Sequence, residues 1–516
     1  MWVRRLFFIL ALLYILPFWV VEYIPTTDGP CHTYNAWVHR QHGNVEEYPL
    51  FNSHYEIDPR PLPNWITHGT LTLLMLAVPP LLAEKILVSG YVLLFLAGAW
   101  YFVGSVRPTE RWPAFLAFPF VYNQLFQFGF YNFSISLGLF FFAVGFWWRH
   151  RDGFGLGAAV TLNLLLWLCW FSHILSFMLA LFSIGVLWLV TLERDRLRRH
   201  LWQIPALGPQ IFLPIWFFAA QGTATVGSAS SFADLFRNFN SLLVLFTFSV
   251  VQIHGARLLA LLFLVLTVLT VLRRRPLRVV KEDGFLLLSL LFVALYYLSP
   301  EGMSGGSILK PRLSLYPFLI LLPWLSPWRG RLAPAVSAAA LALVAALNLG
   351  YLVHWYRLLD VEMRQYARGL EAIRPNSRVL PLLFEHSGSA DLTSIFGHTF
   401  SYVALEKGLV DWDNYSATTS LFPVRFRRSV HRPNVWHIEA TPHEFPLRQY
   451  LDQVDYVYTW KMPPGLVVAR RLRSGYDLIW EKDGGALWQR KPPRAKRVQS
   501  PHAQPARRGE RLRAGA

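Results

Sequence analysis

The sequence predicts an α-helical polytopic membrane protein of about eleven transmembrane helices, followed by a small C-terminal α/β soluble domain. Of its 516 residues, 54% are hydrophobic and only 16% are charged, and the mean hydropathy is +0.32. A soluble chain cannot bury so much apolar surface, so lipid must be the solvent for much of it. Apolar runs of spanning length recur up to about residue 352, and from residue 353 the composition becomes that of a soluble domain.

The predicted spans are apolar runs separated by short polar loops. The first run has a basic start but lacks a small-residue cleavage site, so we expect an uncleaved first helix. The predicted spans lie at 6–24, 84–104, 112–126, 129–148, 154–172, 174–192, 202–220, 254–272, 284–299, 313–327 and 332–352.

Basic residues between the runs predict the topology. Arg4 and Arg5 precede the first span, and later basic loops at 107–111, 149–151, 193–200, 273–281 and 328–331 all fall on the same side if there are eleven spans. The positive-inside rule then places the N-terminus in the cytoplasm and the C-terminal domain outside, as expected for a bacterial inner-membrane protein. This topology requires that the apolar stretches 64–82 and 241–252 do not cross.

The net charge of +18 does not indicate a nucleic-acid partner, because residues 490–516 alone carry nine Lys/Arg against one Glu. Most of the remaining excess lies in the short basic loops. We expect 353–490 to form an extracytoplasmic α/β domain, and 491–516 to be a disordered basic tail. In that domain the patterns predict strands at 377–384, 434–440 and 454–460, helices at 397–409 and 444–453, and a closing hairpin at 476–490.

The first outer loop, 25–83, holds the leading candidate for a functional acid. Asp28 lies in "TTDGP", immediately after the first span. A carboxylate there can act as a general base for an acceptor hydroxyl or bind a divalent metal, and it can equally cap the helix that follows. His32, one helical turn further, can line the same site or be a structural or solvated histidine. His54 and Asp58 are further possible site-lining residues, although Asp58 before Pro59 can simply begin a turn.

A second outer loop supplies candidate cations. Lys310 and Arg312 bracket Pro311 at the outer start of the tenth span, against the positive-inside trend, and a phosphate at headgroup depth would hold them there. The alternative is snorkelling toward lipid headgroups. Arg257 is a weaker candidate of the same kind, and Glu301 is a possible site-lining residue.

Other polar residues have plainer interpretations. Asn132 and His173 lie at outer span ends, where we expect them to bond a neighbouring helix. In the soluble domain, His398 has no recognisable catalytic spacing to its neighbours.

Four stretches resemble segments of the GT-C superfamily of polytopic glycosyltransferases, which includes the protein O-mannosyltransferases and bacterial aminoarabinose transferases. They are "TTDGPCHTYNAWVHRQHG", "DPRPLPNWITHGTL", "AEKILVSGYVLLFLAGAWYF" and "GSILKPRLSLYPFLILL". The resemblance covers roughly 1–350 and implies a transmembrane module at 1–352 with a first outer loop at 25–83.

The same resemblance implies sugar transfer from a polyprenyl-phosphate donor to a glycan, lipid or protein acceptor on the outer face. Asp28 would be the catalytic base, and Lys310, Arg312 and Arg257 would bind the donor phosphate. An acid and cations from two outer loops could converge at headgroup depth, where such a donor presents its sugar. The first outer loop holds neither a tandem Asp-Glu nor a DxD, which leaves a divalent metal cofactor an open question.

Two alternatives belong to other classes of protein. A transporter or lipid flippase would carry out no covalent chemistry, and a non-catalytic partner for envelope assembly would use the C-terminal domain for docking. Transporters often show internal repeats and charges in mid-span, whereas the ionisable residues here gather at one face. This distribution favours surface chemistry.

Overall fold

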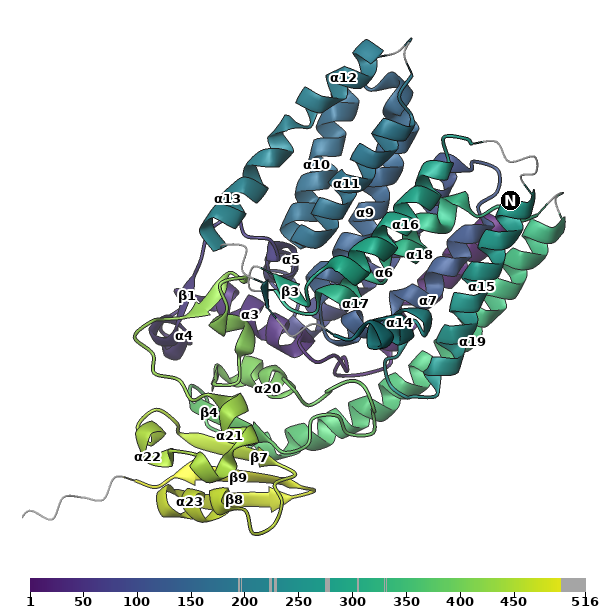
Figure 1. The fold of residues 1–516 in the computed structure, drawn as a ribbon. Helices are drawn as coiled ribbons and strands as arrows, with labels where there is room; N and C mark the ends of the chain where they lie inside the picture. The colour runs from purple at the N-terminus through teal and green to yellow at the C-terminus, as the bar shows by residue number, and fades with distance from the viewer. Residues whose placement is uncertain are drawn as a thin grey trace, which may run out of the picture.

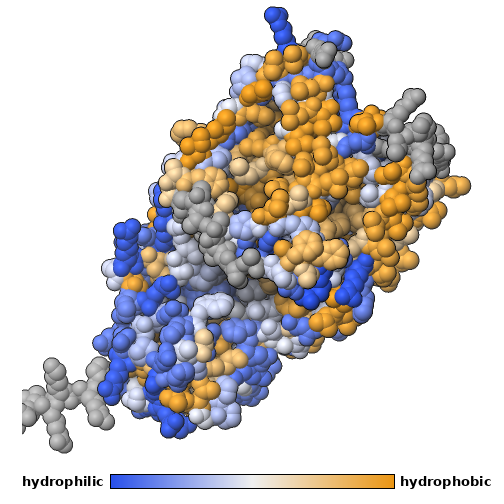
Figure 2. Space-filling view, viewed as in Figure 1, coloured by the Kyte–Doolittle hydropathy of each residue, from blue (hydrophilic) through white to orange (hydrophobic). Residues whose placement is uncertain are grey.

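The protein is mostly helical, with a small sheet region near the C-terminus (Figure 1). The structure is a computed structural model that describes residues 1–193, 195, 197–221, 225–226, 230–273, 279–303, 306–328, 330 and 332–492. The helices form a long bundle, and the sheet lies beyond one end of it. Side chains on the surface of the bundle are largely hydrophobic, while those around the sheet are largely hydrophilic (Figure 2), as expected if lipid surrounds the bundle.

Within the described residues, five helical segments are long and apolar enough to cross a membrane. They are α1 and α2 (Trp2–Leu13, Leu16–Trp19), α6 (Pro80–Val106), α9 with the turn that follows it (Tyr131–His150, Arg151–Gly153), α15 (Gln252–Arg273) and α19 with its last turn (Leu332–Ala367, Arg368–Leu370). A sixth would be α12 (Leu197–Ala206) with α13 (Phe212–Gln221), which meet at a bend of 46°. Three shorter apolar helices are α10 (Leu156–Ser172), α11 (Ile174–Val190) and α16 (Asp283–Leu298).

Two predicted spans are not regular helices. The stretch 112–126 folds as η1 (Trp112–Ala117), α7 (Phe118–Val121) and α8 (Gln124–Gln127). The stretch 313–327 begins at the end of α17 (Leu309–Leu313) and folds as α18 (Tyr316–Leu321) and η6 (Leu322–Trp324). Prolines recur in both stretches and each removes a helical hydrogen bond. Both stretches are almost wholly buried between other helices, where irregular backbone is tolerated at membrane depth.

The two apolar stretches 64–82 and 241–252, which we expected to lie outside the membrane-spanning set, contain only short elements of their own. Residues 64–82 contain α5 (Trp65–Leu74), whose ten residues reach about 15 Å. Residues 241–252 contain only the turn η5 (Leu243–Leu245) before α15 begins. Residues 80–82 already belong to the first turn of α6, so neither stretch contains a separate helix of spanning length.

The predicted cytoplasmic loops lie together at one end of the bundle. Arg107 Nε donates to the carbonyl of Pro323 at 2.6 Å, and Arg273 donates to that of Ser326 at 2.8 Å. Lys281 pairs with Glu193 from a third loop. Parts of the basic loops at 193–200, 273–281 and 328–331 fall outside the described residues.

The C-terminal sheet has five strands in the order β5-β4-β7-β9-β8. They are β4 (Arg378–Leu383), β5 (Val410–Asp411), β7 (Tyr456–Trp460), β8 (Tyr476–Lys482) and β9 (Gly485–Arg490). The first three are parallel, and β9 and β8 close the sheet antiparallel. The predicted strands at 377–384 and 454–460, and the closing hairpin, are confirmed.

The prediction of a strand at 434–440 is wrong, because the segment folds as α21 (Val435–Ala440). Asn434 caps it by accepting from the backbone N–H of His437 at 3.2 Å. Val435 and Ile438 are the buried pair, three residues apart as on one face of a helix, while Trp436 is exposed. The remaining helices of this region are α20 (Phe400–Lys407), α22 (Leu447–Tyr450) and α23 (Val467–Gly475). The helix predicted at 397–409 is confirmed as α20. Of the helix predicted at 444–453, only the four residues of α22 are α-helical.

The first outer loop packs directly against the C-terminal region. It folds as α3 (Gly29–Gln41), α4 (Pro49–His54) and β1 (Tyr55–Ile57), and β1 pairs antiparallel with β6 (Val424–Phe426). Tyr34 of α3 also donates to the carbonyl of Leu409 at 2.6 Å. Helix α19 runs unbroken through the predicted domain boundary at 352/353. Apart from Lys491 and Pro492, the predicted tail 491–516 lies outside the described residues.

Candidate functional site

The backbone of Asp28 is held by the connection between α8 and α9. The N–H groups of Thr27 and Asp28 donate to the carbonyls of Gln127 and Phe128 at 3.0 and 3.1 Å. Gly129 makes this approach possible, because it has a φ of +82° and a Cβ there would lie 2.7 Å from the Asp28 nitrogen. The site therefore begins with two chain segments held together by backbone hydrogen bonds, near the C-terminal region.

The side chain of Asp28 does not cap α3, so that interpretation of the sequence is wrong. It makes no hydrogen bond to the first N–H groups of the helix. Instead, the hydroxyl of Tyr415 donates to Asp28 Oδ2 at 3.0 Å, and His398 Nε2 lies 3.7 Å from Asp28 Oδ1. Asp28 is 7% exposed. A buried carboxylate thus faces a phenol and an imidazole from the C-terminal region.

His398 lies between two acids. Its other nitrogen, Nδ1, is 3.4 Å from Asp413 Oδ2, and its ring stacks on Tyr415 with the ring centres 5.3 Å apart. Burial by itself lowers the pKa of His398, but Asp413 and then Asp28 outweigh it and raise the pKa to about 9. Burial raises the pKa of Asp28 to about 6, against the opposing charge of His398 and the hydrogen bond from Tyr415.

The loop that carries Asp413 and Tyr415 is held on two sides. The backbone N–H of Asp413 donates to Asp411 Oδ1 at 2.9 Å, and Ser401 of α20 donates to the other oxygen of Asp411 at 2.6 Å. Asn414 and Asn35 of α3 exchange two amide hydrogen bonds, at 2.8 and 2.9 Å. The segment after β5 is therefore clamped against both α20 and α3, which fixes the acid–imidazole geometry.

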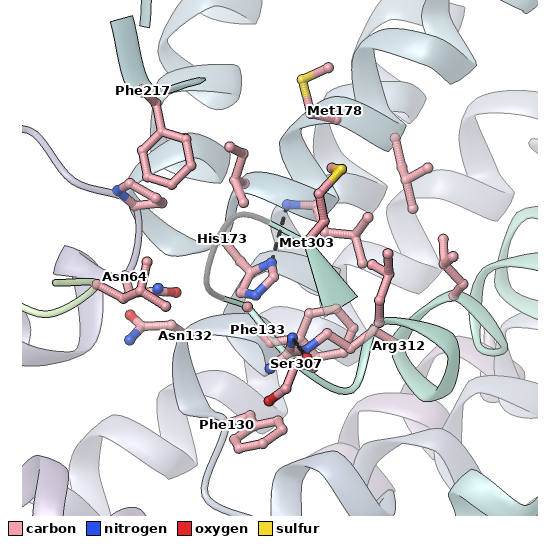
Figure 3. A pocket seen from close by; sticks show the side chains of 18 of the residues that line it. Asn64, Phe130, Asn132, Phe133, His173, Met178, Phe217, Met303, Ser307 and Arg312 are labelled. Carbon is pink, nitrogen blue, oxygen red and sulfur yellow. Dashed lines mark hydrogen bonds between the residues drawn. The ribbon is translucent and has the colours of Figure 1, made fainter. Parts of the chain in front are cut away.

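A cavity of about 420 Å³ adjoins this cluster, and Tyr415 lines it. Its lining is chemically divided. Apolar side chains of α11, α13, α16 and neighbouring segments form most of the wall, including Met178, Leu179, Phe217, Phe218 and Leu295. Polar groups gather at the other end, namely His32, Asn64, Asn132, His173, Arg312 and Tyr415. Figure 3 shows Arg312 beside Phe130 and Phe133 at one side of the cavity, with Met178 and Phe217 well away from it.

Arg312 and Lys310 lie two residues apart on α17 and have different surroundings. Arg312 lines the cavity, its guanidinium carbon lies 4.7 Å from the centre of the Phe130 ring, and it donates to the carbonyl of Ser307 at 2.6 Å. Its buried Nε has no hydrogen-bond partner within the described residues. Lys310 instead donates to the carbonyls of Tyr296 and Tyr297, at 3.1 and 3.3 Å, and does not line the cavity.

The other polar residues of the cavity are partly satisfied by protein. Asn132 accepts from the backbone N–H of Thr67 in α5 at 2.9 Å, which confirms the expected bond to a neighbouring helix. His173 accepts from the N–H of Leu175 at 3.2 Å and so caps α11. His32 lies against His68, with the ring centres 5.1 Å apart, and its buried Nδ1 has no partner among the described residues. Burial lowers the pKa of His32 well below its usual value, so it is neutral.

Four other predicted site residues lie elsewhere. His54 contacts Trp412 and the carbonyl of Leu50, and Arg257 is exposed on α15. Glu301 accepts from Ser230 at 2.7 Å. Asp58 pairs with Arg60 and Arg425 and thereby joins β1 to β6. The structure therefore brings together Asp28, His32 and Arg312, and places these four and Lys310 apart from them.

Sequence reasoning missed His398, Asp413 and Tyr415. The segment that carries two of them alternates Asp411, Asp413 and Tyr415, which by itself reads as an ordinary loop after a strand. It also missed Glu84 in α6, which accepts from the hydroxyls of Tyr131 at 2.8 Å and Tyr402 at 2.7 Å. Tyr415 lies 387 residues from Asp28, and Tyr402 lies 318 residues from Glu84, so no local sequence pattern reveals these contacts.

Within the described residues, no group of three or more His, Cys, Asp or Glu side chains is placed to hold a metal ion. No protein-family model and no curated protein sequence matches the chain. The case for a function therefore depends on the geometry of the site.

Proposed function

We propose that the protein is an integral-membrane glycosyltransferase that moves a sugar from a polyprenyl-phosphate donor to an extracytoplasmic acceptor. In this proposal the chain crosses a bacterial inner membrane eleven times, with two crossings made by the broken segments. The N-terminus is cytoplasmic and the C-terminal region lies outside. The contacts among the basic loops at one end of the bundle support this arrangement.

The observation that carries the proposal is Arg312, a half-buried cation whose buried Nε has no partner within the described residues, at the polar end of an apolar cavity. A polyprenyl phosphate has the complementary chemistry, because its hydrocarbon tail suits the aromatic and aliphatic wall and its phosphate suits the guanidinium. Tyr415 lines the same cavity and donates to Asp28, which places the acid next to the cation's cavity.

The proposed reaction is a single displacement at the anomeric carbon of the sugar. Asp28 accepts the proton of an acceptor hydroxyl as that oxygen forms a bond to the anomeric carbon. The bond from the anomeric carbon to the phosphate oxygen breaks with its electron pair, and polyprenyl phosphate leaves. Arg312 stabilises the negative charge that develops on the leaving phosphate. The products are the glycosylated acceptor, polyprenyl phosphate and a proton held by Asp28.

A flippase or transporter could use the same cavity without covalent chemistry, and an envelope-assembly protein would not need Asp28. The test uses the purified full chain in lipid nanodiscs. Binding of undecaprenyl phosphate is measured first, and then release of labelled sugar from undecaprenyl-phosphate sugars, with and without envelope extract as a source of acceptors.

We expect saturable binding, and transfer that is lost in Asp28→Asn. Binding without release of sugar from any donor would contradict the enzyme and favour a flippase. Asp58→Asn is the matched control, since Asp58 is also a buried acid of the first outer loop but lies outside the site. Equal activity of the Asp28 variant and wild type would overturn the assignment of the base.

A further inference from the structure

His398 is the only group that the C-terminal region presents to Asp28 as a cation among the described contacts of that carboxylate. It lies in the segment before α20, is 6% exposed, and has an acid close to each ring nitrogen. Nδ1 has no hydrogen-bond partner within the described residues, but each ring nitrogen lies 3.4–3.7 Å from a carboxylate oxygen, so the two negative charges favour the doubly protonated, charged imidazole by electrostatic attraction. The geometry thus sets a buried cation directly beside the proposed base.

Several elements contribute charged groups around His398 and Asp28, and together these groups still favour a positively charged His398. Asp28 is faced by His398, Tyr415, Arg312, Asp413 and, one turn along α3, Cys31. His398 is faced by Asp413, Asp28 and Asp411, and more distantly by Glu439, His386 and His32. Acids outnumber cations around the imidazole, so its surroundings favour the charged form.

Arg312 cannot replace His398 in this role. Its guanidinium lies over the rings of Phe130 and Phe133 and its hydrogen bond goes to Ser307. In the proposed function Arg312 also binds the donor phosphate, whose negative charge would neutralise the guanidinium and weaken its effect on Asp28. The cation at ion-pair distance from Asp28 is His398, 3.7 Å from Oδ1.

Asp413 is positioned to orient the imidazole. Its backbone N–H is fixed by Asp411, which is fixed in turn by Ser401. Stacking on Tyr415 holds the plane of the ring, and Tyr415 itself donates to Asp28. These partners lie in the segment from β5 to η8 (Tyr415–Thr418) or in α20, and the two hydrogen bonds between Asn414 and Asn35 hold that segment against α3.

We propose that His398, oriented by Asp413, is a positioning residue that keeps Asp28 ionised, so that the C-terminal region completes the site. A buried carboxyl without a nearby cation takes up a proton and cannot act as a base. The catalytic consequence rests on the proposed function, whereas the ionisation of the pair does not.

The first test reads this ionisation directly and needs no substrate. The full chain is labelled with ¹³C-histidine, placed in nanodiscs and titrated by NMR, and the His398 signal is assigned by its absence in His398→Gln. We expect a midpoint above pH 8 that falls by at least one unit in Asp28→Asn and in Asp413→Asn, and that is unmoved in Asp58→Asn. A wild-type midpoint at or below 6.5, or one that neither variant of a neighbouring acid moves, would overturn the proposal.

The second test is the pH profile of transfer. His398→Gln should move the acidic limb of the profile upward by at least one pH unit and recover much of its turnover at high pH, and Asp413→Asn should do the same to a smaller extent. Loss of transfer by the same factor at every pH would mean that His398 is only structural. If wild type transfers no sugar, the proposed function and the catalytic role fall together, while the NMR titration still decides whether His398 is a cation beside Asp28.

Discussion

Asp28 and Asp58 are two buried acids of the same outer loop, and they differ in what neutralises them. Asp58 accepts from Arg60 and pairs with Arg425, and these guanidinium groups outweigh burial and lower its pKa. Asp28 has no arginine in hydrogen-bond contact among its described partners, and burial raises its pKa to about 6. A carboxylate whose charge is fully compensated holds strands together, whereas one that is poised near neutrality can exchange a proton.

The two cations of α17 repeat the same contrast. Lys310 donates to two carbonyls at the end of α16, which is where a cation stabilises a helix. Arg312 keeps an unpartnered nitrogen in the cavity. In each pair, the residue at the candidate site is the one whose charge is less fully compensated by its protein partners.

The largest expected effect separates the two acids. Asp28→Asn should lower transfer by about 100-fold or more, since removing a general base typically costs at least that factor. Asp58→Asn should leave transfer within about twofold, provided that folding is checked by thermal unfolding. Comparable losses in both variants would erase the distinction between a catalytic and a structural acid.

The next effect is the pH dependence of stability that His398 contributes. Its pKa is raised to about 9 in the folded protein, so the stabilisation is complete below about pH 6.5 and disappears as the pH rises through 9. The size is about 3 kcal/mol, since the pKa rises from 6.5 to about 9 and each pH unit corresponds to about 1.36 kcal/mol. Thermal unfolding at pH 6 and pH 10 should show a larger decline for wild type than for His398→Gln, and parallel declines would refute this.

A smaller effect separates the two cations. Arg312→Gln should weaken binding of undecaprenyl phosphate by about 10- to 100-fold, the loss expected for a hydrogen bond to a charged group. Lys310→Gln should leave binding nearly unchanged and lower the temperature of unfolding, because it strands two buried carbonyls. Isothermal titration in nanodiscs measures the first quantity. If Lys310→Gln weakened binding as much as Arg312→Gln, Lys310 would also bind the donor phosphate, as we expected from the sequence.

The smallest expected effect is on stability. Asp58→Asn removes the ionic contacts between β1 and β6 and should lower the free energy of unfolding by about 1–2 kcal/mol, since both arginines remain partly exposed to water. Chemical unfolding of the full chain in detergent measures it. An unchanged midpoint would mean that the backbone pairing of Tyr55 with Phe426 holds this contact by itself.

Periodicity in the sequence predicted elements well where one interaction dominates. Long apolar runs became α6, α9, α15 and α19, and alternating stretches became β4 and β7. Predictions from periodicity failed where a helix cap or a proline favoured a different local structure from the one that the hydrophobic pattern indicated. Asn434 turned an apparent strand into α21 through one capping bond, and prolines broke two apparent spans. The predicted strand was only seven residues long, too short for alternation to outweigh a cap.

The candidate site divides in the same way. The sequence alone determined that an acid follows the first span and that cations precede the tenth, because hydropathy and charge are local properties that can be read residue by residue. Only the tertiary structure decided that Asp28 faces His398 and Tyr415 instead of capping α3, and that Arg312 lines the cavity whereas Lys310 does not. These outcomes depend on segments nearly 400 residues apart that meet through packing, and the burial and charge of such a meeting place are not encoded in any one of the segments.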